Sequence, residues 1–205
     1  MITAGIQQLV AAELPSWASM VPVRLLGRNV GAVVTSVADE RQRRAACGLA
    51  ALSDPVLLRV LFELPLGVAM PLGCLGRWEQ GVVARGPAGA VERSRGAVTR
   101  LACPPVKVEL VVVWARQWRS GMGWASQYGP FCRRVLVLPS LPCGGERESL
   151  ELEARLYGIG VISDQQVADG WLAPPAPFRP RRLSSGQWLF QERAYAAMLE
   201  AGHPG

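Results

Sequence analysis

The stretch that decides the fold begins with VKVELVVVW at residues 106–114. Two further runs that are short and mainly apolar follow it, RRVLVLPS at 133–140 and IGVIS at 159–163. Such runs are typical of strands that are buried in a sheet. The segments between them, 115–132 and 146–158, carry apolar residues at helical spacing. This alternation of strand and helix predicts an α/β fold, α+β when the whole chain is considered, with these three strands parallel.

The first half of the chain has a different pattern. We expect a helix over 4–14, strands over 21–26 and 30–37, and further helices over 40–52 and 53–64. The last of these begins with Ser-Asp-Pro, which supplies a capping side chain and a proline in the first turn. This half therefore predicts a small unit of helices and short strands.

A hairpin is predicted near the end of that half. Residues 81–85 (GVVAR) and 90–93 (AVER) flank a Gly-Pro-Ala-Gly turn. With the helices before it, the segment from 41 to 95 resembles the winged-helix units of bacterial regulators, in which a similar G-V-V-x-R-G step leads into the wing. The alternative is an ordinary β-hairpin that needs no partner.

A second resemblance rests on motifs spread over 106–163. They are Val108-Glu109-Leu110-Val111, Trp118-Arg119, Trp124 to Tyr128, Arg134 to Pro139 and Tyr157 to Val161. In order and spacing they resemble the PD-(D/E)XK nuclease-like superfamily. The resemblance implies a mixed sheet with flanking helices. We therefore expect a winged-helix-like unit at 1–97 and a degenerate nuclease-like domain with a C-terminal helix at 98–205.

The nuclease resemblance implies a Mg²⁺ site built from two acids and a lysine, and this sequence departs from that pattern. Glu109 stands at the position of the second acid, but Val111 occupies the lysine position, and no aspartate occurs between Asp54 and Asp164. A single carboxylate holds Mg²⁺ weakly. We therefore expect a pseudoenzyme without a cofactor. In the alternative, Lys107 replaces the missing lysine beside Glu109 and the protein is a Mg²⁺-dependent nuclease; otherwise the two side chains form an ordinary ion pair.

The charge is strongly basic. The net charge is +6, and Lys107 is the single lysine among 22 basic residues. Arginine is the better bidentate ligand for phosphate. The excess suits a nucleic-acid backbone, although a solvated surface would look similar. The arginines expected to bind nucleic acid lie around the hairpin and in a cluster before the last helix: Arg77, Arg85, Arg93, Arg95, Arg181 and Arg182.

Several function classes are disfavoured by composition. The five cysteines are widely spaced and His203 is the sole histidine, which argues against a zinc site. The apolar runs are interrupted before they reach membrane-spanning length, so we expect a cytoplasmic protein without a membrane partner.

The leading hypothesis is a non-catalytic DNA-associated regulator or accessory factor. The alternatives are the nuclease with a site at Glu109 and Lys107, and a protein-interaction subunit that uses the fold as a scaffold. The oligomeric state stays open.

Overall fold

The computed structural model describes residues 19–166, 170–179 and 184–202. The helix expected over 4–14, and Arg181 and Arg182, lie outside the described residues. The chain is a mixed α/β protein that divides into two compact units. The sheet unit comprises the described parts of Met1–Thr35 and Val108–Arg181, and the helical unit those of Ser36–Lys107 and Arg182–Gly205. Both units are discontinuous in sequence, whereas the expected division at residue 97 was contiguous.

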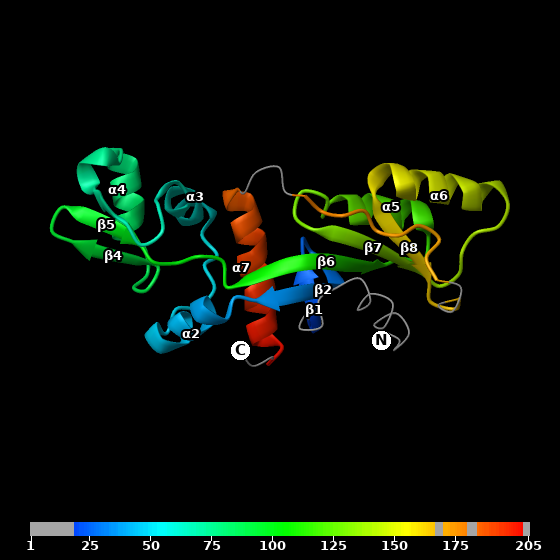
Figure 1. Ribbon diagram of the computed structural model, residues 1–205, viewed down its shortest axis with the longest axis horizontal. Helices are drawn as coiled ribbons and strands as arrows, with labels where there is room; N and C mark the ends of the chain where they lie inside the picture. Colours follow the sequence, from blue (N-terminus) through cyan, green and yellow to red (C-terminus); the bar gives the residue numbers. More distant parts are fainter. Residues whose placement is uncertain (1–18, 167–169, 180–183, 203–205) are drawn as a thin grey trace. The chain divides into compact units, whose positions relative to one another are not determined.

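The sheet unit is built on a mixed five-stranded sheet in the order β1-β2-β6-β7-β8 (Figure 1). The strands β6, β7 and β8 are parallel, as the alternating pattern predicts. The strands β1 and β2 form an antiparallel hairpin, and their turn uses Gly27 at φ +79°. The bounds are β1 Ser19–Leu25, β2 Arg28–Ser36, β6 Val106–Trp114, β7 Arg133–Leu138 and β8 Ile159–Ser163.

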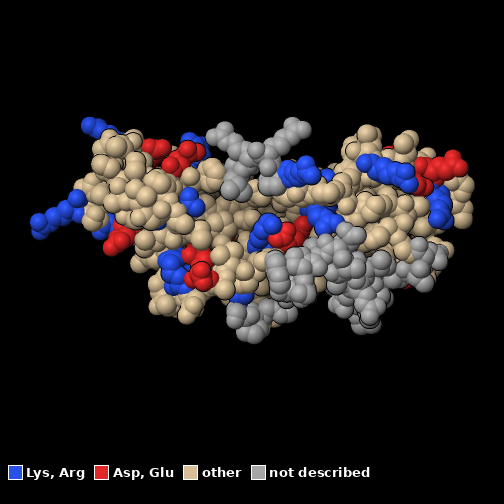
Figure 2. All heavy atoms as spheres, in the orientation of Figure 1, with Lys and Arg blue, Asp and Glu red and all other residues tan. Residues whose placement is uncertain are grey.

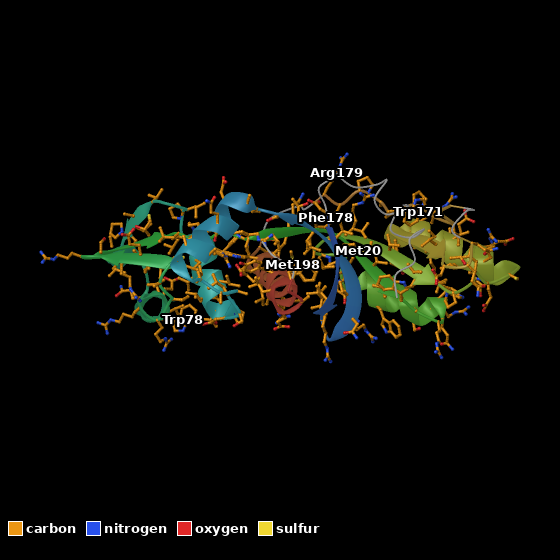
Figure 3. All side chains as sticks on the ribbon, turned by 90° about the horizontal axis from the view of Figure 1, so that it is seen from below. Met20, Trp78, Trp171, Phe178, Arg179 and Met198 are labelled. Atoms are coloured by element: carbon orange, nitrogen blue, oxygen red, sulfur yellow. The ribbon has the colours of Figure 1, made fainter. Side chains whose placement is uncertain are left out.

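Two helices, α5 (Trp118–Ser126) and α6 (Gly145–Tyr157), lie side by side against the parallel strands (Figure 1). The approach of α5 is close, because a Cβ added to Gly121 would lie 2.5 Å from Cδ1 of Leu136. An apolar cluster that includes Leu110, Val112, Val135 and Val137 forms the core of the sheet unit. Met20 and Trp171, labelled in Figure 3, pack against that cluster.

The helical unit contains α2 (Ala38–Cys47), α3 (Pro55–Glu63), the 3-10 turn η1 (Leu72–Cys74), α4 (Arg77–Ala84) and α7 (Ser185–Glu200). Its three-stranded antiparallel sheet has the order β3-β5-β4, with β3 Ala69–Pro71, β4 Val91–Ser94 and β5 Ala97–Arg100. The core joins the apolar faces of α3, α4 and β5 to Trp188 of α7. The last helix of the chain is therefore part of the core of this unit.

The hairpin is placed differently from the sequence expectation. Residues 81–84 are the second half of α4, and the strands of the hairpin are β4 and β5, with the turn at Arg95–Gly96. The prediction of strand over 81–85 is wrong, because Val82 and Val83 face the core from a helix. The helix expected over 40–52 ends at Cys47, since Gly48 adopts the left-handed conformation that terminates helices.

Candidate nucleic-acid interface

Four exposed arginines of the helical unit lie on α4, at its end and on the β4–β5 hairpin. Arg77 is the first residue of α4 and Arg85 caps its C-terminal end. Arg93 lies on β4, and Arg95 lies in the turn of the hairpin. All four are exposed. Figure 2 shows basic side chains projecting beside α4 and from the turn end of the hairpin. The structure thus places four of the six predicted arginines on two successive elements of one unit.

Local hydrogen bonds fix α4 in place. The Glu79 carboxylate accepts a hydrogen bond from the Gly76 backbone N–H at 2.8 Å, which closes the N-terminal end of the helix. Gln80 donates to the carbonyl oxygens of Leu72 and Leu75, both at 2.9 Å, and so ties α4 to the preceding turn. The short helix is therefore held by its neighbours as well as by its own backbone.

Two of the arginines in this region stabilise the fold by donating hydrogen bonds to backbone carbonyl groups. The guanidinium of Arg93 donates to the carbonyl oxygens of Val83 and Ala84 and so joins β4 to the end of α4. Arg100 donates to the carbonyl oxygens of Leu61 and Leu64 at the end of α3 and lies over the ring of Trp188, 4.4 Å from its centroid. Burial lowers the pKa of Arg100. Arg100 is consequently a structural residue, while Arg77, Arg85 and Arg95 are the more accessible cations.

The sequence pattern did not single out Trp78. This residue lies on α4 (Figure 3). Its side chain is 54% exposed, and the guanidinium of Arg59 lies 5.4 Å from its ring centroid. Large aromatic residues at this exposure often contact partners, and arginine stacking keeps the ring in a defined orientation. The sequence offered one indication of this exposed aromatic residue, namely a tryptophan at the start of a short helix. A tryptophan at that position is explained equally well by packing in the core.

Glu109 and Lys107 both lie on β6, two residues apart. Thr35 of β2 donates a hydrogen bond to Oε1 of Glu109 at 3.4 Å, and Glu109 is partly exposed. Burial is the main cause that raises the pKa of the Cys132 thiol, and the negative charge of Glu109 raises it further. Across the described ranges, no group of three or more His, Cys, Asp or Glu side chains is arranged to hold a metal ion.

A cavity of about 470 Å³ lies elsewhere, in the sheet unit, where β6 and β7 end. Arg116 and Arg119 line it together with Trp118 and Glu146. The sequence pattern placed Trp118 and Arg119 in the nuclease-like motif but did not assign Arg116 any role. Their convergence depends on the parallel arrangement of the strands, which brings the segments after β6 and β7 to one edge of the sheet.

Comparison with protein-family models, with curated proteins and with solved structures found no match. Among the residues that the structure describes, no helix combines the length and the apolar character needed to cross a membrane.

Proposed function

We propose that this protein is a non-catalytic DNA-associated factor, a regulator or an accessory protein, that binds double-stranded DNA through α4 and the β4–β5 hairpin. The observation that carries the proposal is the position of Arg77, Arg85 and Arg95 at the two ends of α4 and in the hairpin turn. A short helix followed by a basic hairpin is the arrangement by which winged-helix units present a helix and a wing to DNA.

The order of elements supports the same proposal. The chain runs α3, β3, η1, α4, β4, β5, and the sheet order is β3-β5-β4. Winged-helix units share this succession of a helix, a first strand, a turn-helix pair and a hairpin whose second strand pairs with the first strand. Here the 3-10 turn η1 stands where the first helix of the pair is expected. The resemblance accordingly favours α4 as the helix that approaches DNA.

Electrostatics supports a phosphate-rich partner. In the segment from α4 to the hairpin turn, the acids are Glu79 and Glu92, and the Glu79 carboxylate is already engaged with the backbone of Gly76. The exposed cations Arg77, Arg85 and Arg95 therefore outnumber the one exposed acid of the segment, Glu92. Non-specific DNA binding is supplied chiefly by such contacts with phosphates.

In this proposal, the nuclease-like domain is a scaffold that does not hydrolyse DNA. Glu109 accepts a hydrogen bond from Thr35, and Val111 occupies the lysine position of the motif. A metal-dependent nuclease needs acids that share a metal ion and a group that activates water. The residues on β6 supply one acid of that set, which supports a pseudoenzyme.

The experiment measures binding of the full-length protein to a labelled DNA duplex by fluorescence anisotropy at several salt concentrations. The test variant carries Arg77→Glu and Arg95→Glu. A control of equal charge carries Arg147→Glu and Arg193→Glu, two exposed positions on α6 and α7. We expect the test variant to lose at least about tenfold in affinity and the slope of log K against log salt to become shallower by about one for each lost phosphate contact.

The control should bind close to wild type. Equal weakening of both variants would mean that net charge alone governs binding and would overturn the assignment of this surface. Absence of measurable binding by the wild type at low salt would overturn the DNA-associated function itself.

A further inference from the structure

The cavity in the sheet unit lies at the edge where the parallel strands β6 and β7 end. One side is formed by the residues from Arg116 to Arg119, which connect β6 to α5 and begin that helix. The other side is formed by the loop Ser140–Pro142 and by Glu146 in the first turn of α6, with Leu138 of β7 between the two. In open α/β sheets, the carboxyl ends of parallel strands are the usual place for ligands.

The charge around this cavity is positive. Arg116 and Arg119 contribute two cations, and Glu146 is the one acid among the described residues that line it. The helix α5 begins at the cavity, has no acidic residue in its first turn and has no side chain capping its N-terminal end. The partial positive charge of an α-helix N-terminus adds to that of the arginines. The cavity therefore favours an anion.

Glu146 takes part in a contact that an anion would compete with. Its Oε1 lies 2.9 Å from Nη1 of Arg119, and both side chains are largely exposed. The hydrogen bond from Arg119 is the main cause that lowers the pKa of Glu146, and the interaction with Trp118 is the second. An ion pair at this exposure is weak, so an entering anion can displace the carboxylate at little cost. The other N–H groups of Arg119 also offer donors to such a ligand.

Trp118 forms part of the wall of the cavity and stacks with Arg119. Its side chain lines the cavity and is only 7% exposed, and the guanidinium of Arg119 lies 4.3 Å from its ring centroid. Its indole N–H interacts with the Glu146 carboxyl and lowers the pKa of that group. The Glu146 carboxyl thus contacts both Arg119 and Trp118.

We propose that this cavity binds a small phosphate-bearing molecule of mononucleotide size. The phosphate is held by Arg116, by Arg119 and by the N-terminal end of α5. The organic part lies against Leu141 and Pro142. The volume of about 470 Å³ is within the range of small-molecule sites. The site shares no residue with the surface proposed for DNA, because all of its residues belong to the sheet unit.

The test uses the full-length protein and three probes: inorganic phosphate, adenosine 5′-monophosphate and adenosine. Calorimetry gives the affinity, and the NMR signal of the Trp118 indole N–H reports on the site itself. We expect the monophosphate to bind more tightly than phosphate, adenosine not to bind, and the Trp118 signal to shift along the same saturation curve. Arg116→Gln should weaken binding of the monophosphate by about tenfold or more, as expected for loss of a hydrogen bond to a charged group.

Two further variants make the test specific. Glu146→Gln removes the competing carboxylate and should tighten binding of the monophosphate about two- to fivefold. Arg147→Gln removes a cation from α6 that does not line the cavity and should leave the affinity unchanged. DNA binding should be unaffected by Arg116→Gln, so failure of this site is distinguishable from failure of the DNA surface.

Three outcomes would overturn the proposal. The first is no saturable binding of any probe to the wild type. The second is adenosine binding as well as its monophosphate, which would exclude recognition of phosphate. The third is equal affinity for inorganic phosphate and the monophosphate, which would exclude a site of mononucleotide size.

Discussion

Arg44 of α2 and Glu192 of α7 form a bidentate ion pair although 148 residues separate them in the sequence. The two distances are 2.8 Å from Nη1 to Oε2 and 2.6 Å from Nη2 to Oε1. Arg44 also donates through Nε to Glu40 at 2.7 Å, and Glu192 accepts from the backbone N–H of Leu52 and from the indole of Trp188. The polar atoms of this buried cluster are thus extensively paired within the helical unit.

Removing Arg44 should strongly destabilise the protein. The substitution Arg44→Met leaves Glu40 and Glu192 buried without their shared cation, and we expect a loss of about 3–5 kcal/mol in the free energy of unfolding. The matched control is Arg155→Met, which breaks an exposed pair with Glu151 and should cost about 1 kcal/mol or less. Urea denaturation measures both. Similar losses for the two variants would contradict the assignment of the buried cluster as a stabilising feature.

The same cluster predicts a dependence of stability on pH. Burial alone would raise the pKa of Glu40, but hydrogen bonds from Arg43 and Arg44 outweigh burial and leave the pKa below its usual value of 4.5. A carboxyl with a lowered pKa in the folded state stabilises the fold above the pKa of the unfolded chain, and that contribution disappears as the pH falls through the folded pKa.

We therefore expect the stability difference between wild type and Glu40→Gln to be constant near neutral pH and to shrink below about pH 4.5. Denaturation curves of both proteins between neutral pH and about pH 3 measure it. A difference that grows as the pH falls would contradict the direction of the shift.

Two glycines on α5 should respond oppositely to alanine. A Cβ at Gly121 would lie 2.5 Å from Leu136 Cδ1 and 2.8 Å from Ala115 Cβ, so Gly121→Ala should cost about 1–3 kcal/mol. A Cβ at Gly123 would meet no atom within 4 Å, so Gly123→Ala should stabilise the protein by about 0.5–1 kcal/mol through helix propensity. Thermal unfolding of the two variants tests the pair. Stabilisation by both would show that α5 does not pack closely on β7.

The residues of β6 predict an absence of nuclease activity. Purified protein should not cleave plasmid or single-stranded DNA with Mg²⁺ or Mn²⁺, because Glu109 alone leaves most of the metal's coordination to water. The control is Glu109→Ala, which should leave any background cleavage unchanged. Cleavage by wild type that Glu109→Ala abolishes would make Glu109 and Lys107 an active site and would overturn the pseudoenzyme hypothesis.

The sheet was predictable from the sequence because its signals are local. The runs at β6, β7 and β8 are short and mainly apolar, and Gly158 marks the end of α6 in the left-handed conformation. The expected C-terminal helix is α7, and the side chain of Ser184 caps its N-terminal end. In these cases the pattern, the cap and the buried face agree.

The identity of α4 was not predictable in the same way. Val82 and Val83 favour a strand by local preference and Gly81 disfavours a helix, but both valines are buried in the core of the helical unit. Tertiary packing overrides local preference in so short a segment. The Arg44–Glu192 pair and the cavity at Arg116 were also beyond prediction, since each depends on contacts between segments that only the complete fold brings together.

The interleaving of the two units has a consequence for the newly synthesised chain. The strands β1 and β2 leave the ribosome long before β6, and the helical unit receives Trp188 and Glu192 only when α7 is made. Proteins made of successive domains can fold them one after another during synthesis. In this protein β2 lacks its sheet neighbour β6 until β6 is made, and the helical unit lacks the core residue Trp188 until α7 is made. Cutting the chain at a single point between β2 and α7 therefore leaves at least one unit in two separate pieces of chain.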